Sequence, residues 1–225
     1  MPRPKGYWYL PGMLYDLAFR RMFRALRRRV GRTIEKGELY PWLDVCCGTG
    51  DQFRGLAAGG HVPNGLVCGL DKGFGFVRYA AARAHGVPFV CGDASRLPFK
   101  DGSMRAVSIS FGLHDKSLEL RTGILAEARR VLAPDGQLIA VDFENPWDKK
   151  SKLGMLFTKA IERFASREHY RNGREFLKQG GLKGFLSANG FIEVFRRDVQ
   201  IGSVSVVAAR PGKEDGVKPI FFEKK

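Results

Sequence analysis

The chain has 225 residues, of which 44% are hydrophobic, enough to bury one sizeable core and most simply a single domain. Lys and Arg number 38 against 23 Asp and Glu, a formal net charge of +15, which favours an anionic partner such as acidic lipid, nucleic acid or an acidic protein. No apolar run approaches the roughly 20 residues of a membrane span, and residues 1–6 lack the apolar core of a secretory signal. We therefore expect a cytoplasmic protein.

The N-terminal segment 1–40 carries much of the positive charge. Apolar residues recur at helical spacing between Tyr15 and Leu26, and seven arginines lie within residues 20–32. This pattern predicts a basic amphipathic helix with one apolar face and one arginine-rich face. Two roles are open for it: packing on the core with its charges in water, or lying against anionic lipid headgroups on the substrate side.

From Trp42 onward, short apolar runs alternate with helical stretches. This alternation predicts crossover connections, and therefore a doubly wound, Rossmann-like α/β sheet of mainly parallel strands with helices on both faces. The predicted elements are strands at 41–46, 65–70, 87–91, 104–110 and 136–143, with helices at 50–58, 74–86 and 117–133. Pro134-Asp135-Gly136 predicts a turn before the fifth strand.

The region after the fifth strand changes character. Residues 147–175 are rich in Lys, Arg, Phe and Tyr and are predicted to form helical cover over a site. Another helix runs to about Ala188, and the apolar segments 191–197 and 201–210 predict a terminal β-hairpin. The predicted organisation has three parts: an N-terminal helical segment 1–40, a main domain 41–210 and a loosely held tail 211–225.

The segment Leu43-Asp44-Val45-Cys46-Cys47-Gly48-Thr49-Gly50-Asp51 combines a strand, a glycine turn and a helix start. Unpaired N–H groups at such a turn can hold a polar ligand, and glycine lets it approach the main chain. A dinucleotide fingerprint would need a third glycine at position 53, where Phe53 stands. Asp44 followed by Gly-x-Gly instead resembles the first motif of class I S-adenosylmethionine methyltransferases, although Cys46 replaces the usual first glycine.

Two further acids follow predicted strands. Asp71 ends the second strand, where a carboxylate can accept both hydroxyls of a ribose; the alternative is a helix N-cap. Asp93 ends the third strand, where class I methyltransferases have an acid that accepts the adenine amino group, while the next N–H, that of Ala94, meets the ring. The alternative for Asp93 is a surface turn. The glycine turn, Asp71 and Asp93, in this order, predict S-adenosylmethionine as the cofactor.

Residues 110–116, 126–136 and 141–143 resemble the ubiquinone/menaquinone biosynthesis C-methyltransferases, as does Tyr15-Asp16. The resemblance covers about residues 13–210 and implies a seven-stranded, mostly parallel sheet whose last strand is antiparallel. It also implies cofactor contacts after the first four strands, with Phe76 against the adenine. With the turn residues, the predicted cofactor-binding set is Asp44, Gly48, Thr49, Gly50, Asp71, Phe76, Asp93, Ala94 and Ser110.

This family usually has Arg-Asn where the present chain has His114-Asp115. A hydroquinone carbon is a weak nucleophile until a ring hydroxyl loses its proton, so the reaction needs a base. His114 is our candidate, because it follows the fourth strand and imidazole titrates near neutral pH; Asp115 would orient it or tune its charge. The alternative is a loop histidine bonded to the backbone, and His169-Tyr170 is a second candidate pair.

The resemblance implies C-methylation of a lipophilic small molecule, a prenylated quinol such as a demethylmenaquinol. Because such quinols reside in membranes, the arginine-rich helix would hold the protein peripherally on the inner face of the membrane. Other functions stay open: N-methylation of a phospholipid amine, RNA methylation, or a cofactor-binding subunit without activity. Nucleic acid is disfavoured, since base methyltransferases usually carry Asn/Asp-Pro-Pro-aromatic or Pro-Cys where this chain has residues 110–113. The oligomeric state is not indicated.

The four cysteines are predicted to be reduced, buried, small apolar residues. Because no two of them form a Cys-x-x-Cys pair, no zinc site is predicted. They are Cys46, Cys47, Cys68 and Cys91.

Overall fold

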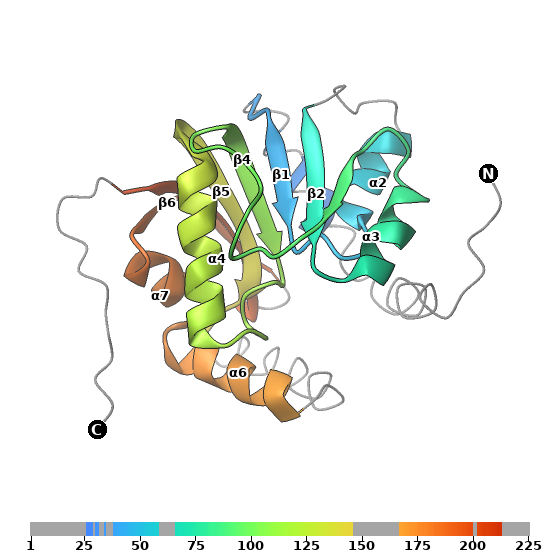
Figure 1. Cartoon of the computed structure of the whole chain (residues 1–225). Helices are drawn as coiled ribbons and strands as arrows, with labels where there is room; N and C mark the ends of the chain where they lie inside the picture. Colours follow the sequence, from blue (N-terminus) through green and yellow to red (C-terminus); the bar gives the residue numbers. More distant parts are fainter. Residues whose placement is uncertain are drawn as a thin grey trace.

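A computed structural model describes residues 26–28, 30–31, 34, 38–58, 66–145, 167–199 and 202–212. Within these residues the strands form one seven-stranded sheet in the order β3-β2-β1-β4-β5-β7-β6, flanked by helices (Figure 1). The strands are β1 Trp42–Val45, β2 Val67–Asp71, β3 Phe89–Cys91, β4 Met104–Ser110, β5 Leu132–Phe143, β6 Phe191–Val199 and β7 Val204–Pro211. The helices are α2 Asp51–Ala58, α3 Phe74–Ala81, α4 Leu118–Val131, α6 Arg167–Lys178 and α7 Gly181–Ala188.

The sheet is parallel from β3 to β5, and β7 is antiparallel to both of its neighbours. All four residues of β1 are buried, as expected for a strand covered on both faces. The predicted doubly wound, seven-stranded sheet with an antiparallel last strand is therefore confirmed. β1 lies between β2 and β4, so the chain order reverses there and the carboxyl ends of β1 and β4 form a topological switch point.

Two predicted boundaries and one predicted turn were wrong. α3 ends at Ala81 rather than 86, and turns follow up to Gly86, which has a φ of 81°. β5 begins at Leu132, directly after α4, so the predicted turn at 134–136 lies inside the strand. The reason is a bulge: Met104 pairs with Leu132 while Ala106 pairs with Gln137, which leaves the residues between without partners in the ladder.

The described part of the N-terminal segment is helical and packs on the core. Leu26, Val30 and Ile34 recur every four residues and are buried, which places them on one helix face. Arg27 pairs with Asp51 at 2.5 Å at the start of α2. The arginine-rich remainder before residue 26, Arg29, Arg32 and the tail after residue 212 lie outside the described residues, so the membrane role of this helix stays a prediction. None of the described helices is long and apolar enough to cross a bilayer.

Candidate functional site

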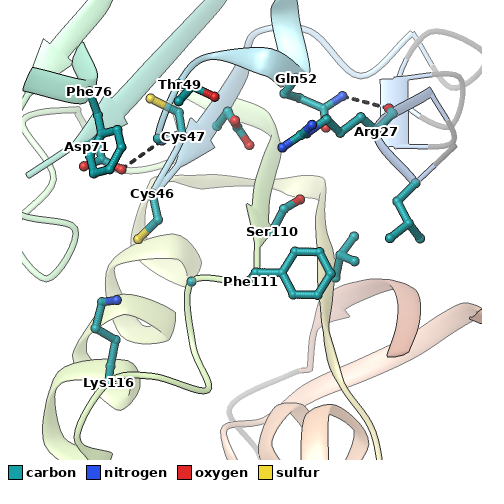
Figure 2. Close-up of a pocket in the computed structure, with 15 residues that line it drawn as sticks. Arg27, Cys46, Cys47, Thr49, Gln52, Asp71, Phe76, Ser110, Phe111 and Lys116 are labelled. Atoms are coloured by element: carbon teal, nitrogen blue, oxygen red, sulfur yellow. Dashed lines mark hydrogen bonds between the residues drawn. The ribbon is translucent and has the colours of Figure 1, made fainter. Parts of the chain in front are cut away.

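A cavity of about 250 Å³ opens at the switch point, beyond the carboxyl ends of β1, β2, β4 and β5 (Figure 2). This is where open α/β sheets bind their ligands. Of the predicted cofactor residues, Asp44, Gly48, Thr49, Asp71, Phe76 and Ser110 line it. The full lining is Leu26, Arg27, Asp44, Cys46, Cys47, Gly48, Thr49, Gln52, Asp71, Phe76, Ser110, Phe111, Gly112, Lys116 and Val141.

The glycine turn after β1 has three left-handed residues. Cys46 has a φ of 57°, so the chain keeps a left-handed backbone at the position where the family usually has glycine. Gly48 has a φ of 52°, and a Cβ built on it meets nothing within 4 Å. Gly50 has a φ of 67°, but its Cβ would lie 2.6 Å from Ala80 Cβ and 2.8 Å from Phe89 Cζ. Gly48 therefore faces open space, whereas Gly50 is required by packing and does not line the cavity.

The Asp71 carboxylate is held at the edge of the cavity by the main chain. Gly48 N donates to Asp71 Oδ2 at 2.9 Å and Gly73 N donates to Oδ1 at 2.7 Å. Gly73 also lies against Phe76, because a Cβ on Gly73 would be 2.7 Å from Phe76 Cδ2. Each carboxylate oxygen can accept a second hydrogen bond. A ligand with two adjacent hydroxyls and an attached ring would fit Asp71 and Phe76 (Figure 2).

Asp44 is a buried acid in the cavity wall. It is 3% exposed, accepts a hydrogen bond from Ser108 Oγ at 2.5 Å, and Ser108 in turn accepts one from Trp42 Nε1 at 2.7 Å. Burial raises the pKa of Asp44 to about 7, against the lowering effects of the Ser108 hydrogen bond and the Arg27 charge. Asp44 and Asp71 are the two acids of the cavity lining, and its two cations, Arg27 and Lys116, are paired with Asp51 and Asp115.

Asp93 and Ala94 do not line the cavity. Asp93 Oδ1 accepts hydrogen bonds from Ser95 N at 2.9 Å and from Ser95 Oγ at 2.7 Å, and these bonds lower the pKa of its carboxyl. Lys72 Nζ lies 3.6 Å from Asp93 Oδ2. Ala94 is buried in the core. The structure therefore shows the surface-turn arrangement of Asp93, and its contact with an adenine stays a prediction.

His114 is buried and paired with a carboxylate beside the cavity. Its Nδ1 lies 2.6 Å from Asp142 Oδ1, and Asp142 also accepts from the N–H groups of Leu113 at 3.1 Å, His114 at 3.3 Å and Phe143 at 2.8 Å. Because a carboxylate can only accept, we assign the Nδ1 proton from this network, and Nε2 is then the nitrogen that exchanges a proton. The His114 and Phe143 ring centroids are 4.2 Å apart.

The carboxylate that contacts the His114 ring is Asp142, and Asp115 makes its contacts elsewhere, so its predicted role in orienting His114 or tuning its charge stays a prediction. Lys116 Nζ donates to both Asp115 oxygens at 2.6 Å, and His169 Nδ1 lies 3.9 Å from Asp115 Oδ2. Burial disfavours the Lys116 ammonium, but the Asp115 charge, the hydrogen bonds to Asp115 and the smaller effects of Cys46 and Asp71 together outweigh burial and raise the pKa of Lys116. The reason is the side-chain direction: Asp142 reaches His114 from the neighbouring strand β5, whereas Asp115 turns toward Lys116, which lines the cavity.

Helix α6 covers the His114 region. The His169 and His114 ring centroids are 5.2 Å apart, so the second candidate histidine lies beside the first. The buried Arg121 of α4 ties α6 in place by donating to Asn172 O at 3.4 Å and to Gln179 Oε1 at 2.7 Å. Its guanidinium lies 5.4 Å from the Phe176 ring centroid.

Sequence reasoning missed Asp142, Lys116 and Arg121 as site residues. Asp142 offered one clue, because it is the single charged residue in the buried, apolar segment 138–143 of β5. The cysteines are also less buried than predicted: Cys46, Cys47 and Cys68 are half-buried, and Cys91 is exposed, since it ends the edge strand β3. Burial raises the pKa of Cys46 to about 12 and that of Cys68 to about 11.

Comparisons with known proteins identify the class. Residues 43–136 match the methyltransferase domain family. The fold is similar to that of a protein from Pyrococcus horikoshii OT3 (TM-score 0.64, 21% identity, 86% of this chain and 91% of that one). It is also similar to magnesium protoporphyrin IX methyltransferase from Synechocystis PCC 6803, solved with bound SAH (TM-score 0.57, 17% identity, 93% and 90%). The fold, the cavity and the matched domain define a class I S-adenosylmethionine-dependent methyltransferase.

Curated relatives narrow the assignment. A demethylmenaquinone methyltransferase from Mycobacterium sp. strain KMS is 32% identical over 213 residues, covering 84% of this chain and 91% of the relative. Another from Beutenbergia cavernae is 40% identical over 104 residues, covering 46% of this chain and 41% of the relative's length. The chain belongs to the methyltransferase family that contains these enzymes.

Proposed function

We propose that this chain methylates a ring carbon of a prenylated quinol, of the demethylmenaquinol type, at the inner face of the membrane. The relatives that bear the demethylmenaquinone methyltransferase name support this acceptor class. The observation that carries the proposal is the buried His114–Asp142 pair, because a base is required by an acceptor whose hydroxyl must lose a proton. Phe111 lies between this pair and the cavity proposed for the cofactor. It lines the cavity, and its ring centroid lies 6.4 Å from that of His114.

S-adenosylmethionine supplies an activated methyl group on a sulfonium, which needs no further activation by the protein. In this proposal Asp71 accepts the ribose hydroxyls, Phe76 packs against the adenine, and the open face of Gly48 lets the cofactor approach the turn. Asp71 places negative charge near the sulfonium, and Asp44, whose pKa is raised to about 7, adds to this charge when it is ionised. The task of these residues is to position the methyl group and exclude water.

His114 acts in this proposal as the general base. Its Nε2 takes the proton of a ring hydroxyl, which raises the electron density on the ring carbon that would attack the methyl group. The sulfonium would leave as a neutral thioether, and the ring carbon would then lose its hydrogen as a proton, which restores the aromatic ring. The imidazolium that forms is stabilised by Asp142, which accepts the Nδ1–H hydrogen bond at 2.6 Å and fixes the tautomer. Lys116 and Asp115 form an ion pair on the same loop. The phenolate that forms when His114 removes the hydroxyl proton would develop near the Lys116 ammonium at the cavity wall.

The test is methyl transfer from labelled S-adenosylmethionine to four acceptors presented in parallel: a demethylmenaquinol, a demethylubiquinol precursor, phosphatidylethanolamine and bulk RNA. We expect label in a quinol. His114→Ala should lower kcat by about 10²–10⁴-fold while leaving the Kd for the cofactor unchanged, because His114 does not line the cavity. His85→Ala is the matched control, since His85 is exposed on the surface. Label in phosphatidylethanolamine or RNA alone would overturn the quinol assignment.

A second variant separates the base from a structural histidine. Asp142→Asn keeps the size of the side chain but replaces the charge that stabilises imidazolium, so kcat should fall on the order of 10²-fold and its pH profile should shift. Cofactor affinity and circular dichroism report whether the fold is intact. Unchanged kcat in both His114→Ala and Asp142→Asn would exclude the base role.

A further inference from the structure

Helix α6 has a basic face that no part of the described core covers. Its members are exposed and recur every three or four residues along the helix. At 100° per residue they fall within an arc of roughly 60°, opposite the buried residues Asn172, Gly173 and Phe176. We call this set the basic face of α6: Arg167, Arg171, Arg174 and Lys178.

An aromatic residue borders this face. Tyr170 is 37% exposed, and the Arg174 guanidinium lies 5.9 Å from its ring centroid. Tyrosine prefers surfaces where one end of its ring is in an apolar and the other in a wet environment. The acidic residues of the helix, Glu168 and Glu175, lie on its other flank, and Glu175 is 3.8 Å from the buried Arg121. The outward charge of α6 is therefore positive.

The position of this face links it to the site. α6 lies beneath the carboxyl ends of the strands, at the margin of the described fold (Figure 1). Its inner face carries His169, whose ring centroid is 5.2 Å from that of His114. Hydrogen bonds hold α6 against the loop between β4 and α4 that contains His114. They come from Arg121 and from Asn172 Nδ2, which donates to Asp115 O at 2.9 Å. A surface that bound the basic face would thus lie one helix diameter from His114.

We infer that the basic face of α6 docks on an anionic lipid bilayer and delivers the acceptor from the membrane to the site. The inference rests on the proposed function, because it takes the acceptor to be a membrane lipid. Charge complementarity supports it: four exposed cations in one stripe attract acidic headgroups, and Tyr170 suits the headgroup level. A lipid surface is favoured over nucleic acid because the stripe is the outer face of a single helix and is bordered by one exposed aromatic residue, Tyr170.

The experiment measures binding of the full chain to sedimented vesicles, without cofactor or acceptor. The vesicles contain phosphatidylcholine alone or with about 30% phosphatidylglycerol, which gives them the negative surface charge of an acidic membrane. Three triple variants are compared: Arg167→Gln/Arg171→Gln/Arg174→Gln on α6, Arg96→Gln/Lys100→Gln/Arg210→Gln as the matched control, and Arg20→Gln/Arg21→Gln/Arg24→Gln in the N-terminal segment. The control residues are exposed and lie outside α6: Arg96 and Lys100 in the connection between β3 and β4, and Arg210 in β7.

Each cation near an acidic membrane contributes about fivefold to binding. The α6 variant should therefore bind the acidic vesicles about 100-fold more weakly than wild type, the control should lose much less, and 0.5 M salt should abolish the difference. Equal loss in the α6 and control variants would overturn the inference, as would loss confined to the N-terminal variant. Binding to bulk RNA that falls in the α6 variant while vesicle binding is unchanged would also overturn it.

Turnover distinguishes this inference from the proposed function. In detergent, where no membrane is needed, the α6 variant should methylate the demethylmenaquinol at the wild-type rate. Normal turnover of wild type with unchanged vesicle binding in the α6 variant would refute the docking surface and leave the acceptor standing. Lost vesicle binding without turnover on any quinol would refute the acceptor and leave the surface standing.

Discussion

The two glycines of the turn after β1 provide a matched test of the structure, because each has a left-handed backbone but only one is packed. The perturbation is Gly48→Ala in one variant and Gly50→Ala in the other. Both substitutions force a side chain into positive φ, at 52° and 67° respectively, which costs about 1–2 kcal/mol. The loss of chain entropy in the unfolded state is the same in both variants and cancels in the comparison.

Packing separates the two variants. The new methyl group at position 48 meets nothing within 4 Å, whereas the one at position 50 would lie 2.6 Å from Ala80 Cβ and 2.8 Å from Phe89 Cζ. Relieving such contacts in a packed core costs about 1–3 kcal/mol. Gly50→Ala should therefore lower the free energy of unfolding by about 2–5 kcal/mol and Gly48→Ala by about 1–2 kcal/mol. The first loss is a large fraction of the 5–15 kcal/mol typical of a domain.

Urea unfolding followed by tryptophan fluorescence measures both free energies, and equal m-values would show that the denatured states are comparable. Calorimetric titration with S-adenosylmethionine completes the comparison. Gly48→Ala should weaken cofactor binding because its methyl group enters the cavity, although its fold is nearly intact. If Gly50→Ala were as stable as Gly48→Ala, the close packing of the turn against α3 and β3 would be refuted.

Three further predictions concern buried polar groups. Burial raises the pKa of Asp44 from 3.8 to about 7. Between these pH values the folded state holds a proton that the unfolded chain releases. The free energy of unfolding should therefore fall as pH rises through this window, by up to about 4 kcal/mol. Urea unfolding at several pH values should show this slope reduced in Asp44→Asn, and an unchanged slope would contradict the assignment. Ser108→Ala leaves the Trp42 N–H and the Asp44 carboxylate without their shared partner, and should cost about 1–3 kcal/mol in thermal unfolding; a neutral effect would argue against the hydrogen-bonded chain. Arg121→Met removes the bonds that tie α4 to α6 and should raise hydrogen exchange in α6 more than in β1, whereas uniform exchange would show that another contact holds the helix.

The succession of strands and helices along the chain, and the parallel direction of most strands, followed from the sequence alone. Apolar runs separated by helix-length segments require crossover connections, and crossovers make neighbouring strands parallel. The glycine turn with Asp44 and Asp71 was likewise recognisable, since it depends on residues close in the chain or on strand ends that meet at one edge. The glycine turn is local in the chain, and the meeting of strand ends follows from the parallel sheet, so the spacing of residues is enough to predict both. Six of the nine predicted cofactor residues accordingly line one cavity.

Tertiary structure decided which side chains meet. Asp142 rather than Asp115 pairs with His114 because β5 lies next to β4 in the sheet, and no local pattern states how side chains 28 residues apart will point. Gly50 is glycine because Ala80 and Phe89 occupy the space of its Cβ, a constraint set by α3 and β3. The position of the basic face of α6 was also decided by tertiary structure. The spacing of its residues could be read from the sequence, but its place beside His114 depends on the long-range hydrogen bonds of Arg121.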